Sequence, residues 1–250
     1  KQGDYASELA KIAPDEKQPT NNTFLVVNFV GLMVGMAMFG TITFLPFFLQ
    51  VVKGISPTSS GLFLVPMMGG LLTASIGSGR YMARTGRYKL LPVFSTALLS
   101  VALLSMTTLA PDSPLWLIAL SMIGIGLGLG PVFSIGVAAI QNAIPVSMLG
   151  VGTASANMFR LIGGAVGTAG FGALFSAGMA HNLVKWLPEA GAGGIRTIEA
   201  EMVAALPPET RAHVLDGIAS ALHPVFWIAA GSALIACIAS TQLRELPLSS

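Results

Sequence analysis

Six long apolar stretches, joined mostly by short polar turns, follow a polar start of the chain. They cover residues 24–49, 59–79, 90–110, 114–140, 149–178 and 222–243. Each reaches the ~20 residues that a helix needs to cross a lipid bilayer. Five of the six contain no Asp, Glu, Lys or Arg. The pattern therefore predicts an all-α integral membrane protein, built as a bundle of six transmembrane helices.

Two longer polar segments frame this pattern. Residues 1–22 are mixed in charge and carry Pro14 and Pro19 as helix breakers, so we expect a cytoplasmic linker there. Residues 23–250 are then the six-helix transmembrane domain. Residues 179–221 are predicted to form an extracytoplasmic loop, which is longer than most connections. Two amphipathic helices are expected in this loop, near residues 195–206 and 208–222.

Composition supports a membrane protein and excludes several other classes. The 250 residues are 53% hydrophobic and only 10% charged, whereas soluble domains carry about 25% charged residues. The net charge of +2 is too small to suggest a nucleic-acid partner. No metal-ligand spacing, nucleophile triad or phosphate-binding loop occurs in the sequence. We therefore expect a protein that is not an enzyme and that holds no metal or cofactor.

The distribution of positive charge predicts the orientation. The segment between the second and third apolar stretches contains four cations: Arg80, Arg84, Arg87 and Lys89. Together with the two ends of the chain, its side of the membrane carries about eight Lys and Arg, against about four on the other side. The positive-inside rule then places this side in the cytoplasm. We expect a multi-pass protein of a bacterial inner membrane, with both ends of this chain in the cytoplasm.

Residues 121–170 are rich in glycine inside two apolar stretches. Each interior glycine costs a helix about 1 kcal/mol relative to alanine in water. In a bilayer the helix persists, and small residues let a neighbouring helix approach closely. We expect these two helices to be a tightly packed pair around which the bundle is organised. Two interpretations stay open for Gly126 and Gly130, simple close packing and a role in rocking the helix or sealing a pathway beside it; Pro131 allows a bend.

Arg160 is the one charged residue within the six apolar stretches. A cation inside a membrane helix is costly and is a candidate functional residue. Two interpretations remain open for it: a structural side chain that reaches the interface, and a gating or substrate-binding group. Every Asp and Glu falls in a loop or near an end of the chain. Proton coupling would need a carboxylate or a histidine at membrane depth; no carboxylate is expected there, and His181, His213 and His223 lie in or beside the 179–221 loop.

The segment 79–89 resembles the loop signature G-x-L-A-D-R-x-G-R-R/K of the major facilitator superfamily. Tyr81 and Ala83 stand where that family has Leu and Asp. The matching residues are Gly79, Arg84, Gly86 and Arg87. In that family the loop joins the second and third helices of a six-helix half and helps to latch the two halves together.

Further matches point to one branch of that superfamily. The order Ser155-Ala156-Asn157, Arg160, Gly163-Gly164 and Gly167 resembles the fifth helix of C-terminal halves in the fourteen-helix drug:proton antiporter branch (EmrB/QacA type). Residues 126–131 resemble a glycine–proline signature of the antiporters. The resemblance covers about residues 22–247. It implies the C-terminal half of a proton-driven multidrug exporter that works by alternating access.

The resemblance also implies where the functional residues lie. The first, second, fourth and fifth helices of a half line the cavity in that family. The substrate-cavity candidates are Asn28, Phe39, Thr43, Phe44, Ser121, Gln141 and Asn157. The gating or conformational candidates are Gly79, Arg84, Gly86, Arg87, Gly126, Gly130, Pro131, Arg160, Gly163 and Gly167.

The implied partners are membrane lipids, an N-terminal transporter half and a small lipophilic or cationic substrate. The proton gradient is the implied energy source, with its coupling residue expected in the N-terminal half. Without that half, we expect no transport by this chain. Two alternatives stay open: export of an endogenous lipid, siderophore or metabolite, and a non-transporting membrane scaffold or sensor that binds a partner through the 179–221 loop.

Overall fold

The computed structural model describes residues 14–86, 89–144, 148–183, 203 and 206–243. Within these ranges the chain is helical almost throughout and contains no strand. The elements are α2 (Pro14–Phe47), the π-helix η1 (Phe48–Val52), α3 (Pro57–Leu62), α4 (Val65–Thr85), α5 (Leu90–Met106), α6 (Leu115–Ala143), α7 (Leu149–Leu183) and α10 (Pro208–Ser240). The predicted all-α fold is confirmed.

Five helical segments are long and apolar enough to cross a membrane. They are Asn22–Val52, Pro57–Thr85, Leu115–Asn142, Leu149–Leu183 and Pro208–Ser240. The third predicted stretch forms α5, which has only 17 residues and is about 25 Å long at 1.5 Å per residue. That length is at the lower limit for a span. The six predicted stretches thus correspond to six apolar helical segments.

Several helix boundaries differ from those expected from hydropathy. Residues 14–22 of the predicted linker are helical as part of α2, and Pro19, expected to break a helix, lies inside it. Helix α10 begins at Pro208, so the predicted amphipathic helix 208–222 and the last apolar stretch are one helix. Val214, Ile218 and Leu222 are buried at i, i+4 and i+8, so the packed face continues past the expected boundary. Most of the predicted helix 195–206 lies outside the described residues.

The segment after the second apolar stretch ends in a glycine turn. Helix α4 ends at Thr85, and Gly86 follows with a φ of 68°, a left-handed conformation that side-chain-bearing residues rarely adopt. The Gly86 N–H donates to the carbonyl oxygen of Met82 at 2.9 Å, which satisfies one of the last carbonyls of the helix. This turn is the structural reason for a glycine in the predicted loop signature.

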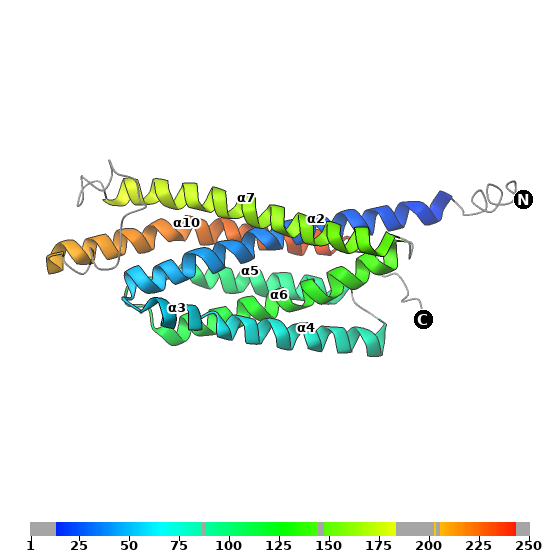
Figure 1. The fold of residues 1–250 in the computed structure, drawn as a ribbon, viewed down its shortest axis with the longest axis horizontal. Helices are drawn as coiled ribbons and strands as arrows, with labels where there is room; N and C mark the ends of the chain where they lie inside the picture. The colour runs from blue at the N-terminus through cyan, green and yellow to red at the C-terminus, as the bar shows by residue number, and fades with distance from the viewer. Residues whose placement is uncertain (1–13, 87–88, 145–147, 184–202, 204–205, 244–250) are drawn as a thin grey trace, which may run out of the picture.

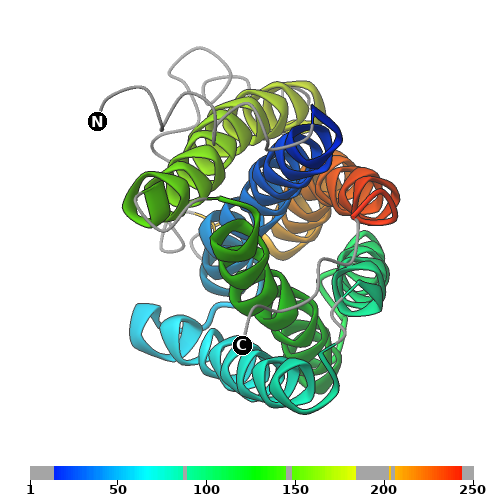
Figure 2. The ribbon, with the colours of Figure 1, turned by 90° about the vertical axis from the view of Figure 1, so that its right-hand side faces the viewer.

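Successive long helices run in opposite directions along the bundle (Figure 1). Four of them form one curved layer, and the other two cover one side of it (Figure 2). Figure 2, which looks along the bundle, shows α7, α2, α6 and α4 following one another in a curved layer. Helices α10 and α5 pack against each other and cover one side of it. Figure 1 shows that α2 begins, and α10 ends, at the end of the bundle where α4 ends and α5 begins. This end is called the α4–α5 end below.

Glycines on α6 bring it into backbone contact with α4. A Cβ on Gly126 would lie under 3.0 Å from the carbonyl oxygen of Met67, and a Cβ on Gly130 would be equally close to that of Leu71. Glycine at i and i+4 makes a flat strip on which the α4 backbone lies. The close-packing interpretation of these two residues therefore has a specific partner, helix α4. Pro131 lies within α6, which continues to Ala143.

Glycines on α7 form a second strip, and its partner is α2. A Cβ on Gly163 would lie under 3.0 Å from the carbonyl oxygen of Leu32, and one on Gly167 would be as close to the Cα of Met36. The prediction that the two helices of residues 121–170 form the tightly packed pair that organises the bundle is therefore wrong, although Gly152 near the start of α7 does pack against Ile140 of α6. Each strip meets a different helix. The sequence could not predict the partners, because small residues indicate a close approach without specifying which neighbouring helix approaches.

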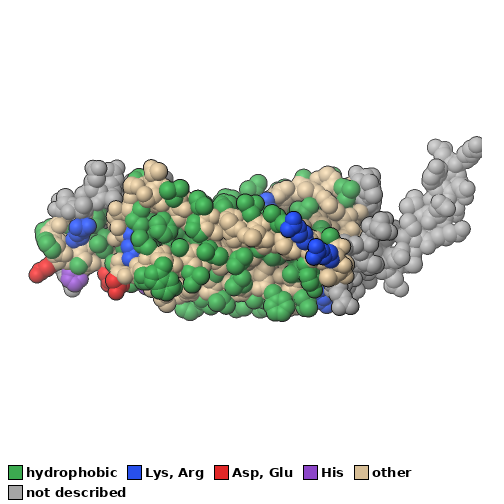
Figure 3. Space-filling model, turned by 90° about the horizontal axis from the view of Figure 1, so that it is seen from below, with side chains coloured by type: hydrophobic (Ala, Val, Ile, Leu, Met, Phe, Trp, Pro, Cys, Tyr) green, Lys and Arg blue, Asp and Glu red, His purple; other side chains and the backbone are tan. Residues whose placement is uncertain are grey.

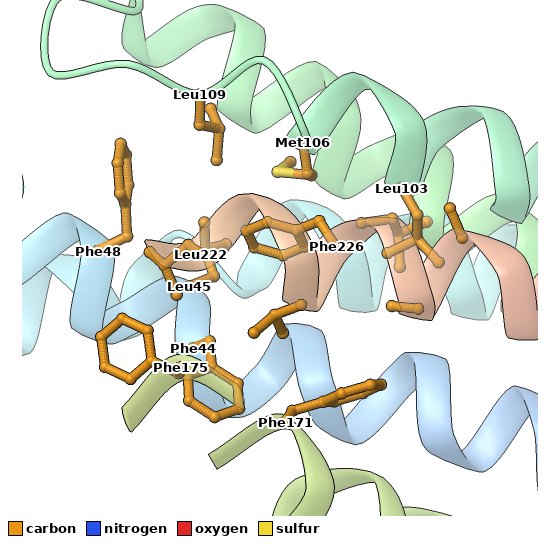
Figure 4. Close-up of a cluster of buried hydrophobic side chains, with 14 of the residues drawn as sticks. Phe44, Leu45, Phe48, Leu103, Met106, Leu109, Phe171, Phe175, Leu222 and Phe226 are labelled. Atoms are coloured by element: carbon orange, nitrogen blue, oxygen red, sulfur yellow. The ribbon is translucent and has the colours of Figure 1, made fainter. Parts of the chain in front are cut away.

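A cluster of large side chains fills the bundle where α2, α5, α7 and α10 meet (Figure 4). Phe44 and Phe175 contact each other with their ring centroids 5.5 Å apart, and Phe47 lies 5.2 Å from Phe175 at a steep angle. Phe171 and Phe226 are also buried there. This apolar core joins the α2–α7 pair to the two covering helices.

The surface has the distribution expected of a membrane protein. Figure 3 shows a broad apolar band with charged side chains near the two ends of the bundle, and the Asp, Glu and His side chains seen on this face gather where α10 begins. Large apolar side chains are more than half exposed on several helices, for example Phe94, Val151 and Trp227. Exposed apolar surface on this scale is unfavourable in water and favourable in lipid. The described helices support a multi-pass membrane protein.

Candidate functional site

A pocket of about 600 Å³, its open mouth included, lies between α2, α6 and α7. Val27, Val30 and Val34 are one stripe of α2 at helical spacing and form one apolar wall. Pro92 at the start of α5 and Leu243 after α10 also line it, so the pocket lies toward the α4–α5 end. The remaining lining residues are Gly31, Val132, Phe133, Ile135, Gly136, Val137, Ala139, Ala156, Asn157 and Arg160.

Arg160 and Asn157 form the polar corner of this pocket. They lie one turn apart on α7, and the Arg160 Nη2 donates a hydrogen bond to the Asn157 Oδ1 at 2.6 Å. The guanidinium carbon of Arg160 lies 4.3 Å from the centroid of the Phe133 ring, where the negative face of the ring attracts a cation. Among the described residues, no carboxylate pairs with this guanidinium. The pocket thus combines apolar walls with one positive charge.

The depth of Arg160 bears on its two open interpretations. It lies about 17 Å along α7 from Leu149 at 1.5 Å per residue, and its side chain is half-buried. Its guanidinium lies over a ring of α6 that lines the pocket. This arrangement is compatible with both interpretations, so the structural role and the gating or substrate-binding role each stay a prediction.

Asn28 is held inside the α2–α7 contact. Its side chain is buried, its Nδ2 donates to the carbonyl oxygen of Phe24 at 2.8 Å, and its Oδ1 accepts a hydrogen bond from the Ser155 Oγ at 3.3 Å. Ser121 is placed in the same way between α6 and α5, where its Oγ lies 2.7 Å from that of Ser105. Both side chains connect neighbouring helices, and neither lines the pocket.

The other cavity candidates lie in different surroundings. The Phe39 ring packs against Gly164 of α7, and the Phe44 ring lies in the core cluster of Figure 4. Thr43 and Gln141 are exposed on α2 and α6. Of the seven substrate-cavity candidates, Asn157 lines the pocket.

Phe133 is the pocket residue that sequence reasoning missed. It is one aromatic residue in an apolar helix, two positions after Pro131, and nothing in the local pattern distinguishes it from a lipid-facing side chain. Only the packing of α7 on α6 brings Arg160 over its ring. The sequence therefore carries no signal for Phe133, because only the packing shows that this part of α6 faces Arg160.

The candidates of the predicted loop signature lie at the α4–α5 end. Gly79 has open space where a Cβ would stand, and Arg84 is exposed in the last turn of α4. Arg87 lies outside the described residues. A role for this segment in latching two halves together stays a prediction.

Lys53 ties the end of α2 to the connection between α5 and α6, at the opposite end of the bundle. It follows the π-helix η1, and its Nζ donates to the carbonyl oxygens of Pro111, at 2.6 Å, and of Ser113. Burial lowers the pKa of the Lys53 ammonium, and the Asp112 carboxylate opposes part of this shift. The ammonium therefore holds two chain segments that are distant in sequence.

Replacing Lys53 with methionine should lower the stability of the bundle. The two carbonyl oxygens would lose a charged donor, which contributes about 1.5 kcal/mol. Thermal unfolding of the intact protein in detergent measures the change. Lys53→Arg keeps the charge and the donors, so it should unfold close to the wild-type temperature. Equal unfolding temperatures for K53M and wild type would show that the cross-connection does not stabilise the fold.

Comparison with known proteins gives the family of the chain. Residues 10–168 match the model of the Major Facilitator Superfamily. The chain is 37% identical over 226 residues to the uncharacterized MFS-type transporter Rv1877 of Mycobacterium tuberculosis (strain ATCC 25618 / H37Rv), which covers 90% of this chain and 33% of that protein. It is 36% identical over 140 residues to a tetracycline resistance determinant of Streptomyces rimosus, covering 56% of this chain and 40% of that protein.

A third relative is the multidrug transporter protein MdtP of Bacillus subtilis (strain 168). The identity is 37% over 159 residues, which are 63% of this chain and 29% of that protein. The chain therefore spans about a third of the length of these relatives. The matched family region, the identity to Rv1877 along most of the chain and the apolar helical bundle agree with one another. The chain belongs to the major facilitator superfamily of membrane transporters.

Proposed function

We propose that this chain is the C-terminal half of a proton-driven exporter of the fourteen-helix drug:proton antiporter branch, and that the exporter removes small lipophilic compounds from the bacterial cytoplasm. The order of the three motif resemblances along the chain supports this branch. Two relatives are named as a tetracycline resistance determinant and a multidrug transporter, and a third as a tetracenomycin C resistance and export protein. Two of these names state resistance, one states transport of several drugs, and the tetracenomycin C protein is also named for export.

The observation that carries the proposal is the pocket between α2, α6 and α7. Its walls are apolar, and its few polar groups converge at one corner, which is the composition typical of a site for a small organic molecule. The predicted cationic substrate finds no support in this pocket, because its polar corner carries the positive charge of Arg160. The lipophilic part of the prediction is compatible with the valine-rich wall.

The packing of the bundle suits the proposed mechanism of alternating access, in which two halves rock against each other around a central site. The α4–α6 and α2–α7 pairs are in backbone contact along glycine strips, so each pair moves as one piece. We infer that this chain moves as a single unit against an N-terminal half. The pocket would then open and close as that other half approaches or leaves.

The proposed proton coupling depends on a residue outside this chain. A coupling group needs a carboxylate or histidine whose pKa is brought into range by burial. No Asp or Glu occurs in the six apolar stretches, and the one histidine there, His223, stands at the edge of the last stretch with its Nε2 on the Leu109 carbonyl oxygen. The coupling residue is therefore proposed for the N-terminal half. The proposed orientation puts the α4–α5 end, with the exposed Arg80 and Arg84, in the cytoplasm.

Export can be tested in a bacterium that lacks its own efflux pumps. Cells producing the intact protein should accumulate several-fold less tetracycline or lipophilic dye than cells with an empty vector. A protonophore should abolish the difference, because it removes the proposed energy source. The present chain expressed alone should give no export. Equal accumulation with and without correctly inserted intact protein would refute the proposal, and export insensitive to the protonophore would refute its proton-driven part.

A further inference from the structure

The guanidinium of Arg160 has no counter-charge and one hydrogen-bond acceptor among the described residues. Arginine has five N–H donors in one plane, and the Asn157 Oδ1 accepts one of them. Within the described residues no Asp or Glu neutralises the guanidinium. The side chain is half-buried beside apolar walls, where an unpaired charge is costly. A ligand that brings an opposite charge would remove this cost.

Phe133 orients the guanidinium for such a ligand. The guanidinium carbon lies over the face of this ring, 4.3 Å from its centroid. The N–H groups spread outward in the guanidinium plane, so those directed away from the ring stay available to a ligand. An oxyanion with two oxygens can accept two of these N–H groups in parallel. Asn157 fixes the guanidinium from its own helix.

The rest of the pocket selects the body of the ligand. Val27, Val30 and Val34 of α2 and Val132 of α6 line it with aliphatic surface. Such walls favour a hydrocarbon chain or ring system and offer no partner for a second charged group. The site therefore combines one positive charge at a corner with a lipophilic remainder.

We propose that this pocket binds an anionic amphiphile, a molecule with one carboxylate or phosphate group on an apolar body, whose oxyanion pairs with Arg160. Two sources share this chemistry: a soluble organic acid in the cytoplasm and the phosphate of an anionic membrane lipid. A lipophilic cation is disfavoured at this pocket, because it would face the arginine charge. The inference rests on the proposed function only for the fate of the ligand, because binding itself requires no transport.

The test is binding of dodecyl phosphate to the intact protein, purified in a neutral detergent and followed by calorimetry. Dodecyltrimethylammonium, which has the same chain and the opposite charge, is the matched probe and should bind at least about tenfold more weakly. Arg160→Gln should weaken dodecyl phosphate binding at least about tenfold, which corresponds to about 1.4 kcal/mol. Arg160→Lys keeps the charge without the fork of donors and should bind with intermediate affinity.

Arg211→Gln is the control variant. It removes the same charge from an exposed position in the first turn of α10, at the opposite end of the bundle, so it should bind dodecyl phosphate as the wild type does. Wild-type affinity in R160Q, or equal affinity for the two dodecyl probes, would overturn the proposal. If R160Q does not fold, R160K is tested in its place. An R160K variant that binds dodecyl phosphate no more tightly than dodecyltrimethylammonium would overturn the proposal as well.

A competition experiment separates the two sources. Phosphatidylglycerol supplied in nanodiscs should displace dodecyl phosphate if the site holds a lipid phosphate, whereas phosphatidylcholine should not. If dodecyl phosphate still binds in phosphatidylglycerol nanodiscs, the site takes a soluble organic anion rather than a lipid phosphate. Binding that depends on Arg160 without any export would leave this inference intact and refute the proposed function. Export of a dye without anion binding would do the reverse.

Discussion

Replacing Gly163 with alanine should unfold or misassemble the bundle and abolish export. The new Cβ would lie under 3.0 Å from the carbonyl oxygen of Leu32, which is a backbone atom and has no rotamer to change. Helix α7 would have to move away from α2 along the strip that Gly163 and Gly167 form. Overpacking in a close-packed interior costs roughly 1–3 kcal/mol, and we expect the upper end of this range because backbone meets backbone.

Gly170→Ala is the matched control on the same helix. Nothing lies within 4 Å of a Cβ at Gly170, so alanine there costs no contact and gains helix propensity of about 1 kcal/mol in water. Thermal unfolding in detergent and the fraction of monodisperse protein on size exclusion measure both variants. If Gly163→Ala and Gly170→Ala unfold at the same temperature, then the α2–α7 contact is not as close as the structure shows.

Replacing Gly126 with alanine should have a comparable effect at the other strip. Its Cβ would lie under 3.0 Å from the carbonyl oxygen of Met67, and Gly130 makes the same kind of contact one turn later. Helix α4 would be pushed off α6, and the turn at Gly86 would move with it. We expect a large loss of folded protein in the membrane, and a loss of export per folded molecule in whatever remains.

The control for this strip is Gly69→Ala, on the partner helix. A Cβ at Gly69 meets nothing within 4 Å, so this variant should keep both folded yield and export. Export measured per amount of folded protein separates a folding defect from a functional one. Normal export and yield in Gly126→Ala would mean that α4 and α6 have room for a methyl group between their backbones. The close-packing account of the strip would then be wrong.

The candidate site was only partly accessible from the sequence. A lone cation in an apolar helix is visible as Arg160, and Asn157 is visible one turn before it. The contact of Arg160 with the Phe133 ring was not visible in the sequence, because the distance between side chains of α6 and α7 depends on how the helices pack. Asn28 is the kind of polar residue expected in a cavity, yet in the structure its Nδ2 donates to Phe24 within α2 and its Oδ1 accepts from Ser155 of α7. A polar side chain in an apolar helix indicates a partner without indicating which one.

The sequence by itself determined the class and the number of apolar helical segments. A bilayer requires about 20 apolar residues per span and permits only helices with satisfied backbones, so hydropathy alone carries this information. It also determined that a turn follows α4, through Gly86. Only the tertiary structure decided that the strip of Gly126 and Gly130 on α6 meets α4 while the strip of Gly163 and Gly167 on α7 meets α2. Small residues let any helix approach, so the choice among neighbours comes from how all six helical segments pack together.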